Sequence, residues 1–457
     1  MMKISQTAGR IHGRMVPVKF GRMVPVNFAF FFLLPLLAVP SAAFSQALPT
    51  AEAAPISTGF ALPRAAGALQ YAVSASENLN YGYYGNSGVD SATNLSGDLA
   101  YISSSKVYPF SVVFSGGHGW SSSYQPSYSY LNLAMSQVLN LRRWDFVLSD
   151  SVSYLPSTPT TGLSGVPGVG DLGLNPVQVG ADTGQGVLTD FSTRVGNTAS
   201  ASVQRPLTGK TSIQGSGSYD VMRFLGDSTG ISDANGLDSD GASGSIGLSH
   251  RIDARTSVSG NFAYSRYTYG VGLPGFSSQT ASLQFTRQLT RKLGISASVG
   301  PQWTTVSGSP NGAPSVNLFT SLSASYAGEF THASLSYTRS TNSGSGVAAG
   351  ALSDGVAFSA GRTFARVWSC SFSSGYTQTA NLSSAALTPG ATPFSFHTTV
   401  VGVQVSRALR RSLSAYASYT LQDQSSQGSA VDAFSGHSQV AGFGLTYSPS
   451  SIHLGHQ

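Results

Sequence analysis

Residues 281–300 alternate between apolar and polar side chains in two runs that are separated by a short basic break. Ala281, Leu283 and Phe285 alternate with polar neighbours, and the same alternation resumes after the break at 287–292. Because successive side chains of a strand point to opposite faces, each run predicts a strand with one apolar and one polar face. The break is short, so the two strands are expected to be antiparallel neighbours.

This unit recurs along the chain. Similar breaks lie at 205–210, 251–255, 328–331, 362–366 and 407–411, with looser versions at 105–108 and 139–143. Successive breaks are usually separated by roughly 35 to 45 residues, which leaves room for two strands of about ten residues and a longer loop. The repeat predicts an all-β fold, a transmembrane antiparallel up-and-down β-barrel of about 18 strands, the pattern allowing roughly 16 to 18. Short periplasmic turns and longer extracellular loops would join the strands.

The alternation places the individual strands. Upward strands are expected near 67–83, 107–118, 142–155, 209–222, 255–268, 291–304, 329–340, 366–379 and 411–424. Downward strands are expected near 94–105, 127–139, 192–206, 242–252, 278–288, 315–326, 353–363, 395–408 and 437–448. An even number of strands leaves both termini of the chain in the periplasm.

The first part of the chain has the pattern of an export signal. In residues 1–45 a basic segment precedes the apolar run 28–39, which is too short to span a bilayer and is followed by small residues. This segment predicts a secretory signal peptide. Residues 46–66 are then expected to be a periplasmic lead-in, 67–448 the outer-membrane barrel and 449–457 a C-terminal tail.

Composition narrows the function classes. Charged residues make up 10% of the chain, whereas soluble domains carry about 25%. The formal charge of +6 is misleading, because five basic residues precede the apolar run and the remainder is nearly neutral. The basic residues of the barrel are scattered, which argues against nucleic acid. Cys370 is the only cysteine, so there is no intramolecular disulfide.

Tyrosines recur at similar positions in the upward strands and predict an aromatic girdle at the outer membrane interface. Most stand eight to ten residues after a periplasmic turn, a rise of roughly 20–25 Å at about 3.3 Å per residue and a tilt near 40°. The predicted girdle consists of Tyr219, Tyr264, Tyr337, Tyr376 and Tyr419. Arg266 and Arg339 follow two of these tyrosines and would meet lipid phosphate or solvent.

The opposite face of the strands is small, neutral and hydroxyl-rich, and is expected to line the lumen. The pore-lining candidates are Ser257, Ser259, Asn261, Gln284, Ser296, Ser298, Ser334, Ser336, Ser414, Ser418 and Asp220. No strand carries a ladder of arginines opposite a row of acids. Asp150 breaks the parity of its strand, which suggests a β-bulge there. The Gly/Pro-rich loop 156–190 would lie across the mouth or fold inward.

No sequence motif supports catalysis, metal binding or phosphate binding. The histidines assemble into no triad with a nucleophile, and no metal-ligand spacing or phosphate-binding loop occurs, so no catalytic, cofactor or metal residue is predicted. The four aspartates of the loop 224–240 match no calcium-binding template and fit a solvated loop better.

The repeated hairpins, such as 406–419, resemble the outer-membrane β-barrel proteins encoded with bacterial exopolysaccharide systems, in which a basic or polar turn leads into Leu-Ser-x-x-x-x-Tyr-like strands. The resemblance covers about residues 67–448. It implies an export pore. Strand number is similar to that of the alginate-export barrel, but the Arg- and Lys-lined lumen of that family is missing. If the chain is an export pore, this departure predicts a neutral polymer.

Three function classes remain open: a passive or exopolysaccharide-export channel, a structural or adhesive barrel acting through its surface loops, and, less favoured, a barrel enzyme. The expected partners are outer-membrane lipid and lipopolysaccharide, a polysaccharide or small neutral solute, and envelope proteins, without nucleic acid or a cofactor. The expected location is the outer membrane of a Gram-negative-type bacterium.

Overall fold

The computed structural model describes most of residues 67–453. The gaps are 83–87, 104, 106–107, 122–126, 156–192, 226–236, 271–272, 308–313, 345–348, 366, 383–394, 428–435 and 451. The predicted signal peptide, the lead-in and the loop 156–190 lie outside the described residues. Within the described part, no helix is long and apolar enough to cross a membrane.

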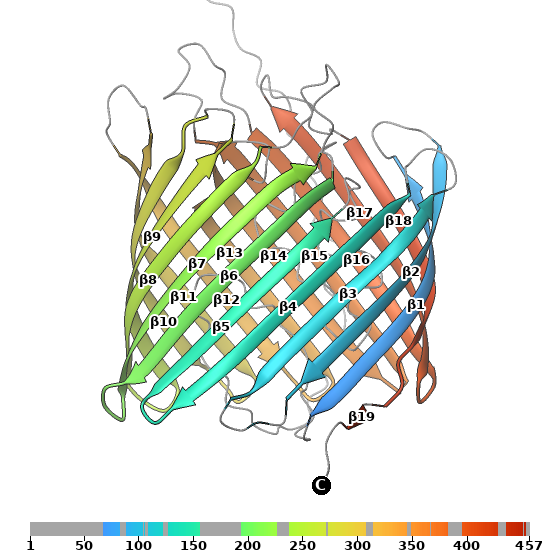
Figure 1. The fold of residues 1–457 in the computed structure, drawn as a ribbon, viewed down its shortest axis with the longest axis horizontal. Helices are drawn as coiled ribbons and strands as arrows, with labels where there is room; N and C mark the ends of the chain where they lie inside the picture. Colours follow the sequence, from blue (N-terminus) through green and yellow to red (C-terminus); the bar gives the residue numbers. More distant parts are fainter. Residues whose placement is uncertain are drawn as a thin grey trace, which may run out of the picture. The chain divides into compact units, whose positions relative to one another are not determined.

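The described residues form long β-strands joined by turns and loops (Figure 1). The strands are β1 (Ala68–Tyr81), β2 (Val89–Ile102), β3 (Phe110–Ser121), β4 (Tyr128–Leu141), β5 (Trp144–Leu155), β6 (Thr193–Pro206), β7 (Thr211–Leu225), β8 (Ser239–Arg251), β9 (Thr256–Tyr269), β10 (Phe276–Gln288), β11 (Leu293–Val306), β12 (Ser315–Ala327), β13 (Thr331–Asn342), β14 (Ala351–Phe364), β15 (Trp368–Asn381), β16 (Ser395–Arg410), β17 (Leu413–Gln427), β18 (Gly436–Tyr447) and the short β19 (Ile452–His453).

The sheet closes on itself. Each of β1 to β18 pairs antiparallel with its sequence neighbours, and β1 pairs with β2 on one side and with β18 on the other, where Val73 lies opposite Tyr447. Closure leaves no long free edge, because the last long strand completes the backbone pairing of the first. The fold is therefore a closed, 18-stranded, antiparallel, up-and-down β-barrel, which confirms the predicted fold class.

Most strands lie within a few residues of their predicted positions, but the N-terminal hairpins differ. β2 begins at Val89 rather than near 94, and β3 begins at Phe110 rather than near 107. The connection between them is longer than a tight turn, and within it the Ser105 hydroxyl accepts the Tyr108 backbone N–H at 3.0 Å. β19 was not predicted. It continues the wall past β18 by pairing with the first two residues of β1.

The short connections at one end of the barrel, called here the inner end, share one construction. In the β6–β7 turn the Thr208 hydroxyl accepts the backbone N–H groups of the residues two and three positions later, and Thr290 does the same in the β10–β11 turn. In the β8–β9 turn Asp253 takes this role, and its carboxylate accepts the Arg255 N–H at 2.6 Å. A side-chain acceptor thus fixes each turn and the strand register beyond it.

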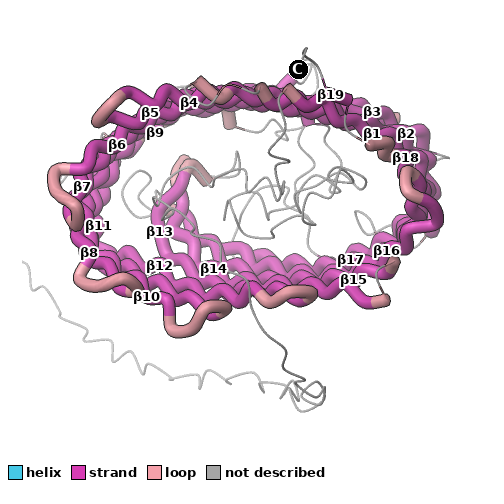
Figure 2. The backbone as a smooth tube through the Cα atoms, turned by 90° about the horizontal axis from the view of Figure 1, so that it is seen from below, coloured by secondary structure: helices cyan, strands magenta, loops and turns pink. Residues whose placement is uncertain are grey.

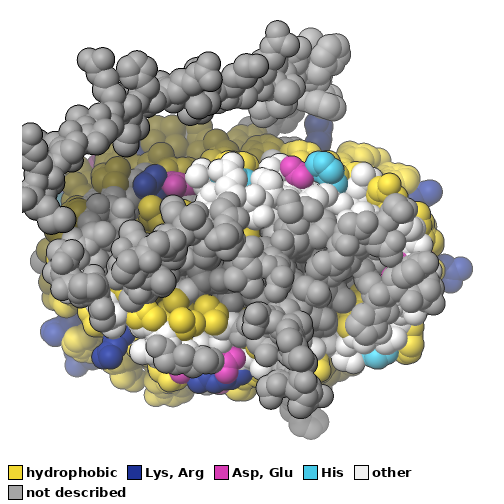
Figure 3. All heavy atoms as spheres, turned by 90° about the horizontal axis from the view of Figure 1, so that it is seen from above, with side chains coloured by type: hydrophobic (Ala, Val, Ile, Leu, Met, Phe, Trp, Pro, Cys, Tyr) yellow, Lys and Arg dark blue, Asp and Glu magenta, His cyan; other side chains and the backbone are white. Residues whose placement is uncertain are grey.

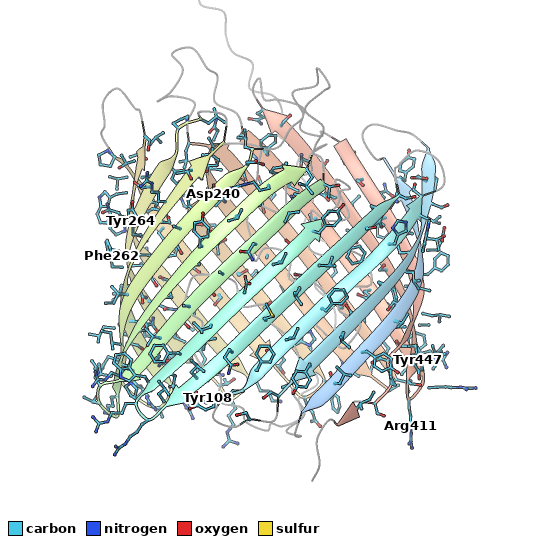
Figure 4. The ribbon with its side chains drawn as sticks, viewed as in Figure 1. Tyr108, Asp240, Phe262, Tyr264, Arg411 and Tyr447 are labelled. Carbon is cyan, nitrogen blue, oxygen red and sulfur yellow. The ribbon has the colours of Figure 1, made fainter. Side chains whose placement is uncertain are left out.

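The two faces of the wall differ in chemistry. In β10, Leu283 on the outward face is 59% exposed, whereas its neighbour Gln284 on the inward face is 8% exposed. Figure 4 shows the labelled Phe262, Tyr264 and Tyr447 projecting away from the barrel. Large apolar side chains cover the outward face of nearly every strand. The barrel therefore presents hydrocarbon outward and polar groups inward, the reverse of a soluble domain.

Candidate functional site

The candidate site is the inward face of the wall. Every predicted pore-lining residue lies on this face, opposite the exposed apolar residues of its own strand: Ser257, Ser259 and Asn261 in β9, Gln284 in β10, Ser296 and Ser298 in β11, Ser334 and Ser336 in β13, Ser414 and Ser418 in β17, and Asp220 in β7. Some of them touch. The Gln284 amide donates to the Ser296 hydroxyl at 3.3 Å, and Asn261 accepts from Gln214 at 3.1 Å. Asp220 lies in β7, the strand that also carries Gln214, six residues further along it.

Serine hydroxyls pair across adjacent strands along the inward face. The Oγ–Oγ pairs are Ser149–Ser200 at 2.6 Å, Ser216–Ser245 at 2.7 Å, Ser218–Ser243 at 2.7 Å, Ser334–Ser359 at 2.7 Å and Ser369–Ser406 at 2.5 Å. Each hydroxyl can donate once and accept twice, so a pair retains capacity for further hydrogen bonds. The inward face is therefore a dense array of neutral donors and acceptors.

Inward tyrosines lie across glycines of the neighbouring strand. Tyr128 is directly opposite Gly119, and its hydroxyl reaches Asn94 one strand further on at 2.5 Å. Tyr130 is opposite Gly117, and a Cβ added to that glycine would come within 2.5 Å of the phenol oxygen. These glycines make room for a ring that lies along the wall, and the ring covers backbone that a glycine leaves bare. The tyrosines therefore add aromatic surface to the inward face, and their rings lie along the wall and do not project into the lumen.

Charge on the inward face is sparse but not absent. Asp90 and Asp98 in β2 are inward and buried, and Asp90 accepts a hydrogen bond from Ser121 at 2.8 Å. Arg194 lies on the inward face of β6, in register with Phe224. Sequence reasoning singled out only Asp220. The signal for Asp90 and Asp98 was the strict alternation of β2, which puts both aspartates in phase with Asn94 and Ser96.

The part of the β13–β14 hairpin that is furthest from the short turns folds to the inside of the wall (Figure 2). The Tyr269 hydroxyl, on the inward face of β9, donates to the Ser343 carbonyl at 2.9 Å. The Thr341 hydroxyl donates to Ser278 in β10 at 3.3 Å, and its backbone N–H donates to the Gln302 side chain in β11 at 3.3 Å. The hairpin thus overlaps the inward face of β9 to β11, and it narrows the barrel there.

An aromatic stack supports this overlap. Tyr267 and Tyr269 both stack on Phe276, with ring centroids 4.9 and 6.5 Å apart, and Phe276 is 1% exposed. Gly350 meets the ring: its φ is +90°, and an added Cβ would lie 2.7 Å from the Phe276 ring. Only glycine fits there, because both the backbone conformation and the space exclude a side chain. Strand alternation carries no signal for this contact.

The predicted girdle tyrosines all lie on the outward face, toward the end opposite the short turns, called here the outer end. Four of them form a hydrogen bond with a side chain on the following strand. Tyr219 donates to Asp240 at 3.5 Å, Tyr337 to Asp354 at 2.9 Å and Tyr419 to Gln439 at 2.9 Å, and Tyr376 shares a hydrogen bond with His397 at 3.0 Å. Tyr264 is 41% exposed. Figure 3, seen from the outer end, shows acidic, basic and histidine side chains among hydrophobic ones along the rim.

The expected bulge at Asp150 is wrong. β5 keeps an unbroken register with both β4 and β6, so Asp150 lies on the outward face with Leu148 and Tyr154. Its carboxylate accepts a hydrogen bond from Asn197 of β6 at 2.8 Å. A neutral donor on the next strand therefore accommodates the acid, where the sequence suggested a break in the alternation. Register is irregular instead between Ala408 and Arg410, at the inner end of β16.

Other ionisable groups form contacts near the outer end of the barrel. Arg223 and Asp240 form an ion pair at 2.7 Å, and Asp238 accepts the Phe224 backbone N–H at 2.9 Å. His437 contacts Asp423 at 2.8 Å, and the pair is exposed. Over the described ranges, no group of histidine, cysteine and acidic residues could hold a metal ion. These contacts brace neighbouring strands.

Comparison with known proteins gives a limited result. No protein-family profile and no curated protein sequence matches this chain. Among solved structures it is similar to Pseudomonas aeruginosa OpdQ, with 9% identity, 84% of this chain and 99% of that chain covered, and a TM-score of 0.41. It is also similar to P. aeruginosa OprD (12%, 85% and 96%, TM-score 0.40) and to Acinetobacter baumannii OccAB3 (10%, 84% and 99%, TM-score 0.42).

Proposed function

We propose that this chain is an outer-membrane channel through which uncharged, hydrophilic solutes pass passively. The observation that carries the proposal is the contrast between the two faces of one closed wall. Outward, Leu283, Leu322 and Phe443 are 59%, 44% and 55% exposed, a pattern that is stable against lipid and costly against water. Inward, paired serines and amides would line an aqueous path, and a barrel of about 16 to 18 strands is wide enough for one.

The direction of insertion follows from the two ends. Short turns at the inner end and longer connections at the outer end are the arrangement of outer-membrane barrels, with the turns in the periplasm. The girdle of outward tyrosines would then stand at the outer interface, where amphipathic rings prefer to lie. Export through a signal peptide at 1–45 fits this location.

The solute class follows from the inward face. Hydroxyls that pair with one another can exchange those bonds for bonds to a sugar, as water does, so a carbohydrate could move along the wall without a deep binding site. A small sugar or a neutral polysaccharide fits this chemistry. Export of an exopolysaccharide remains one form of the proposal, and the narrowing by the β13–β14 hairpin favours a small solute over a polymer.

Ion selectivity tests the proposal. The pure protein is inserted in planar bilayers, and the reversal potential is measured across a salt gradient. We expect discrete conductance steps with weak selectivity. The slight preference should be for cations, because among the described strand residues the inward acids Asp90, Asp98, Asp145 and Asp220 outnumber the inward bases Arg194 and Arg251. Asp98→Asn should reduce that preference, whereas Glu329→Gln, a change at an exposed inner-end turn, should leave it unchanged.

Two results would overturn the proposal. Strong anion selectivity would contradict the weakly charged inward face. The absence of conductance from protein that is folded and inserted would favour the alternative, a structural or adhesive barrel that acts through its surface loops. Liposome swelling in raffinose, maltose and glucose then gives the solute size limit.

A further inference from the structure

Arginines recur on the outward face of the wall near its inner end. Arg205 in β6, Arg287 in β10, Arg362 in β14 and Arg407 in β16 each lie within a few residues of the end of a strand that runs toward the short turns. Their parity and cross-strand register place all four on the face that carries the exposed apolar residues. An arginine at this height can keep its guanidinium in water while its aliphatic part lies along apolar surface.

Two of these arginines stack on a tryptophan of the neighbouring strand. The Arg407 guanidinium carbon lies 5.1 Å from the centre of the Trp368 ring, and the two residues are direct partners in the β15–β16 ladder. The same contact joins Arg205 to Trp144, at 4.8 Å. A guanidinium that stacks uses its flat face, so its in-plane N–H groups remain able to donate hydrogen bonds. The tryptophan therefore positions a planar group of donors at the surface.

The stack in β15 and β16 has a second arginine beside it. Arg362 of β14 is directly opposite Cys370, two residues beyond Trp368 along β15, so it is a diagonal neighbour of the ring. Arg362 and Arg407 are both exposed. Neither side chain forms an ion pair or a hydrogen bond within the described part of the chain. Trp368 thus lies between two accessible positive charges.

Apolar surface continues from this group toward the middle of the wall. Further along the β15–β16 ladder, Phe372 is directly opposite Val403 on the outward face, and the two are 38% and 39% exposed. Tyr376 of the outer girdle follows on the same strand. From Trp368 to Tyr376 the strand rises about 20 Å at about 3.3 Å per residue and a tilt near 40°, which is close to the height of the apolar band of a barrel. Trp368 therefore stands at the inner interface.

The inner end offers these arginines little counter-charge. Most of the short turns there carry a basic residue, such as Arg143 or Lys210. The acids of the described turns and strand ends are Asp145, Asp253 and Glu329, and none of them contacts the arginines beside Trp368. A surface with one sign of charge attracts ions of the other sign from its surroundings.

We propose that Arg362, Trp368 and Arg407 bind the head group of an anionic phospholipid of the periplasmic leaflet, whose acyl chains lie along Phe372 and Val403. Guanidinium groups bind phosphate through several N–H donors in one plane. The indole ring stands between head group and hydrocarbon, where amphipathic rings prefer to lie. Charge, ring and apolar side chains thus follow one another along β15 and β16 in the same order as head group, interface and acyl chain in the lipid. The proposal rests on the proposed function, because the outward face must meet a bilayer.

Trp368 reports on its own lipid contacts. The full chain, with Trp120, Trp144 and Trp303 changed to Phe, is inserted into phosphatidylcholine vesicles that contain increasing fractions of acyl-brominated phosphatidylglycerol or acyl-brominated phosphatidylcholine. We expect the anionic lipid to quench Trp368 at a roughly two- to fivefold lower mole fraction, the size of one or two partly exposed ion contacts. Changing both arginines, Arg362→Gln with Arg407→Gln, should remove that difference. A difference that persists in the double variant would overturn the site.

Two controls separate the site from the general charge of the barrel. Arg291→Gln removes an exposed arginine from the β10–β11 turn at the same end, several strands from β15, and should leave the lipid preference of Trp368 unchanged. A second chain keeps only Trp303, which lies on the outward face of β11 opposite Val316, and should be quenched equally by the two lipids. The same preference at both tryptophans, or its loss in Arg291→Gln, would overturn the site in favour of general electrostatic attraction.

The outcomes also separate this proposal from the proposed function. If both lipids quench Trp368 equally, the barrel is inserted and the lipid site is wrong. If neither lipid quenches Trp368 or Trp303, the outward face does not meet lipid, and the proposed function fails as well. Heat-dependent migration in gels shows that each variant is folded. Raising the salt concentration should reduce the preference for phosphatidylglycerol, because exposed charge contacts are screened.

Discussion

The Tyr337 hydroxyl donates to the Asp354 carboxylate at 2.9 Å, although the residue directly opposite Tyr337 is Val356. The acceptor thus lies two positions from the direct cross-strand partner, further toward the outer end. The same diagonal joins Tyr219 to Asp240, Tyr376 to His397 and Tyr419 to Gln439, whose direct partners are Ala242, Thr399 and Ala441. Diagonal neighbours are within reach of long aromatic side chains. The girdle is therefore a repeated structural element.

Removing one phenol should measure what this contact contributes. We expect Tyr337→Phe to lower the free energy of unfolding by about 0.5–1.5 kcal/mol, the net value of one hydrogen bond. Tyr264→Phe is the control, because Tyr264 occupies the same girdle with no hydrogen bond to a described residue, and it should change stability less. Urea titration in lipid vesicles, followed by tryptophan emission, gives both values. Equal losses of unfolding free energy in the two variants would mean that the diagonal hydrogen bond adds no stability beyond that of a tyrosine at the membrane interface.

Adjacent residues of β12 test the assignment of the two faces. Leu322 is outward and 44% exposed, whereas Ser323 is inward and exposed. We expect Leu322→Arg to destabilise the barrel by about 2–4 kcal/mol if the residue meets the bilayer near its middle, since a guanidinium there loses its hydration. Ser323→Arg should be nearly neutral. Equal damage from both changes, measured by the same titration, would show that the inward face is not water-filled.

Topology in the cell can be tested with single cysteines in a Cys370→Ser background. Leu273, in the connection between β9 and β10, is 39% exposed, and Ile252, in an inner-end turn, is 53% exposed. A membrane-impermeant maleimide should label Leu273→Cys on intact cells and should reach Ile252→Cys only after the outer membrane is permeabilised. The opposite labelling pattern would mean that the barrel is inserted in the opposite orientation.

Asp253 should make an inner-end turn sensitive to acid. The Arg255 backbone N–H, with contributions from Thr256, holds the pKa of the Asp253 carboxyl below its ordinary value. A depressed pKa means that the stabilisation is present above the ordinary pKa and is lost as pH falls through the folded one. We therefore expect Asp253→Asn to be less stable than the unaltered barrel at neutral pH, with the difference shrinking below about pH 4. Unfolding midpoints across pH would reveal a constant difference if the carboxylate has no such role.

The alternation of apolar and polar residues predicted the strands and their two faces well, because each strand of the wall must show it independently. Ser257 and Tyr264 could be assigned to opposite faces from local sequence, since parity holds as long as the register is unbroken. Asp150 shows where local reasoning failed. An outward acid looks like a break in the pattern, but its donor, Asn197, lies in the next strand beyond a long loop, and no periodicity links the two.

The inward fold of β13–β14 could not be predicted for a related reason. It depends on Tyr269, Phe276 and Gln302, which sit in three other strands and look like ordinary wall residues in the sequence. Gly344 and Gly350, both with positive φ, lie in the connection between β13 and β14, but glycine is too common in this chain to mark a site. Tertiary contacts decide the path of the hairpin, and strand periodicity carries no information about such contacts.

The hairpin contacts lead to the last prediction, which concerns conductance. Tyr269→Phe removes the bond to the Ser343 carbonyl, and Thr341→Val removes the hydroxyl bond to Ser278, while the aromatic stack and the backbone of β13 are kept. If the hairpin narrows the path, the double variant should show larger or more frequently fluctuating single-channel currents, because the outer end of β13–β14 is held less firmly. Tyr264→Phe, in the same strand but on the outward face, should conduct like the unaltered barrel. Unchanged currents in the double variant would place the narrowest point elsewhere along the lumen.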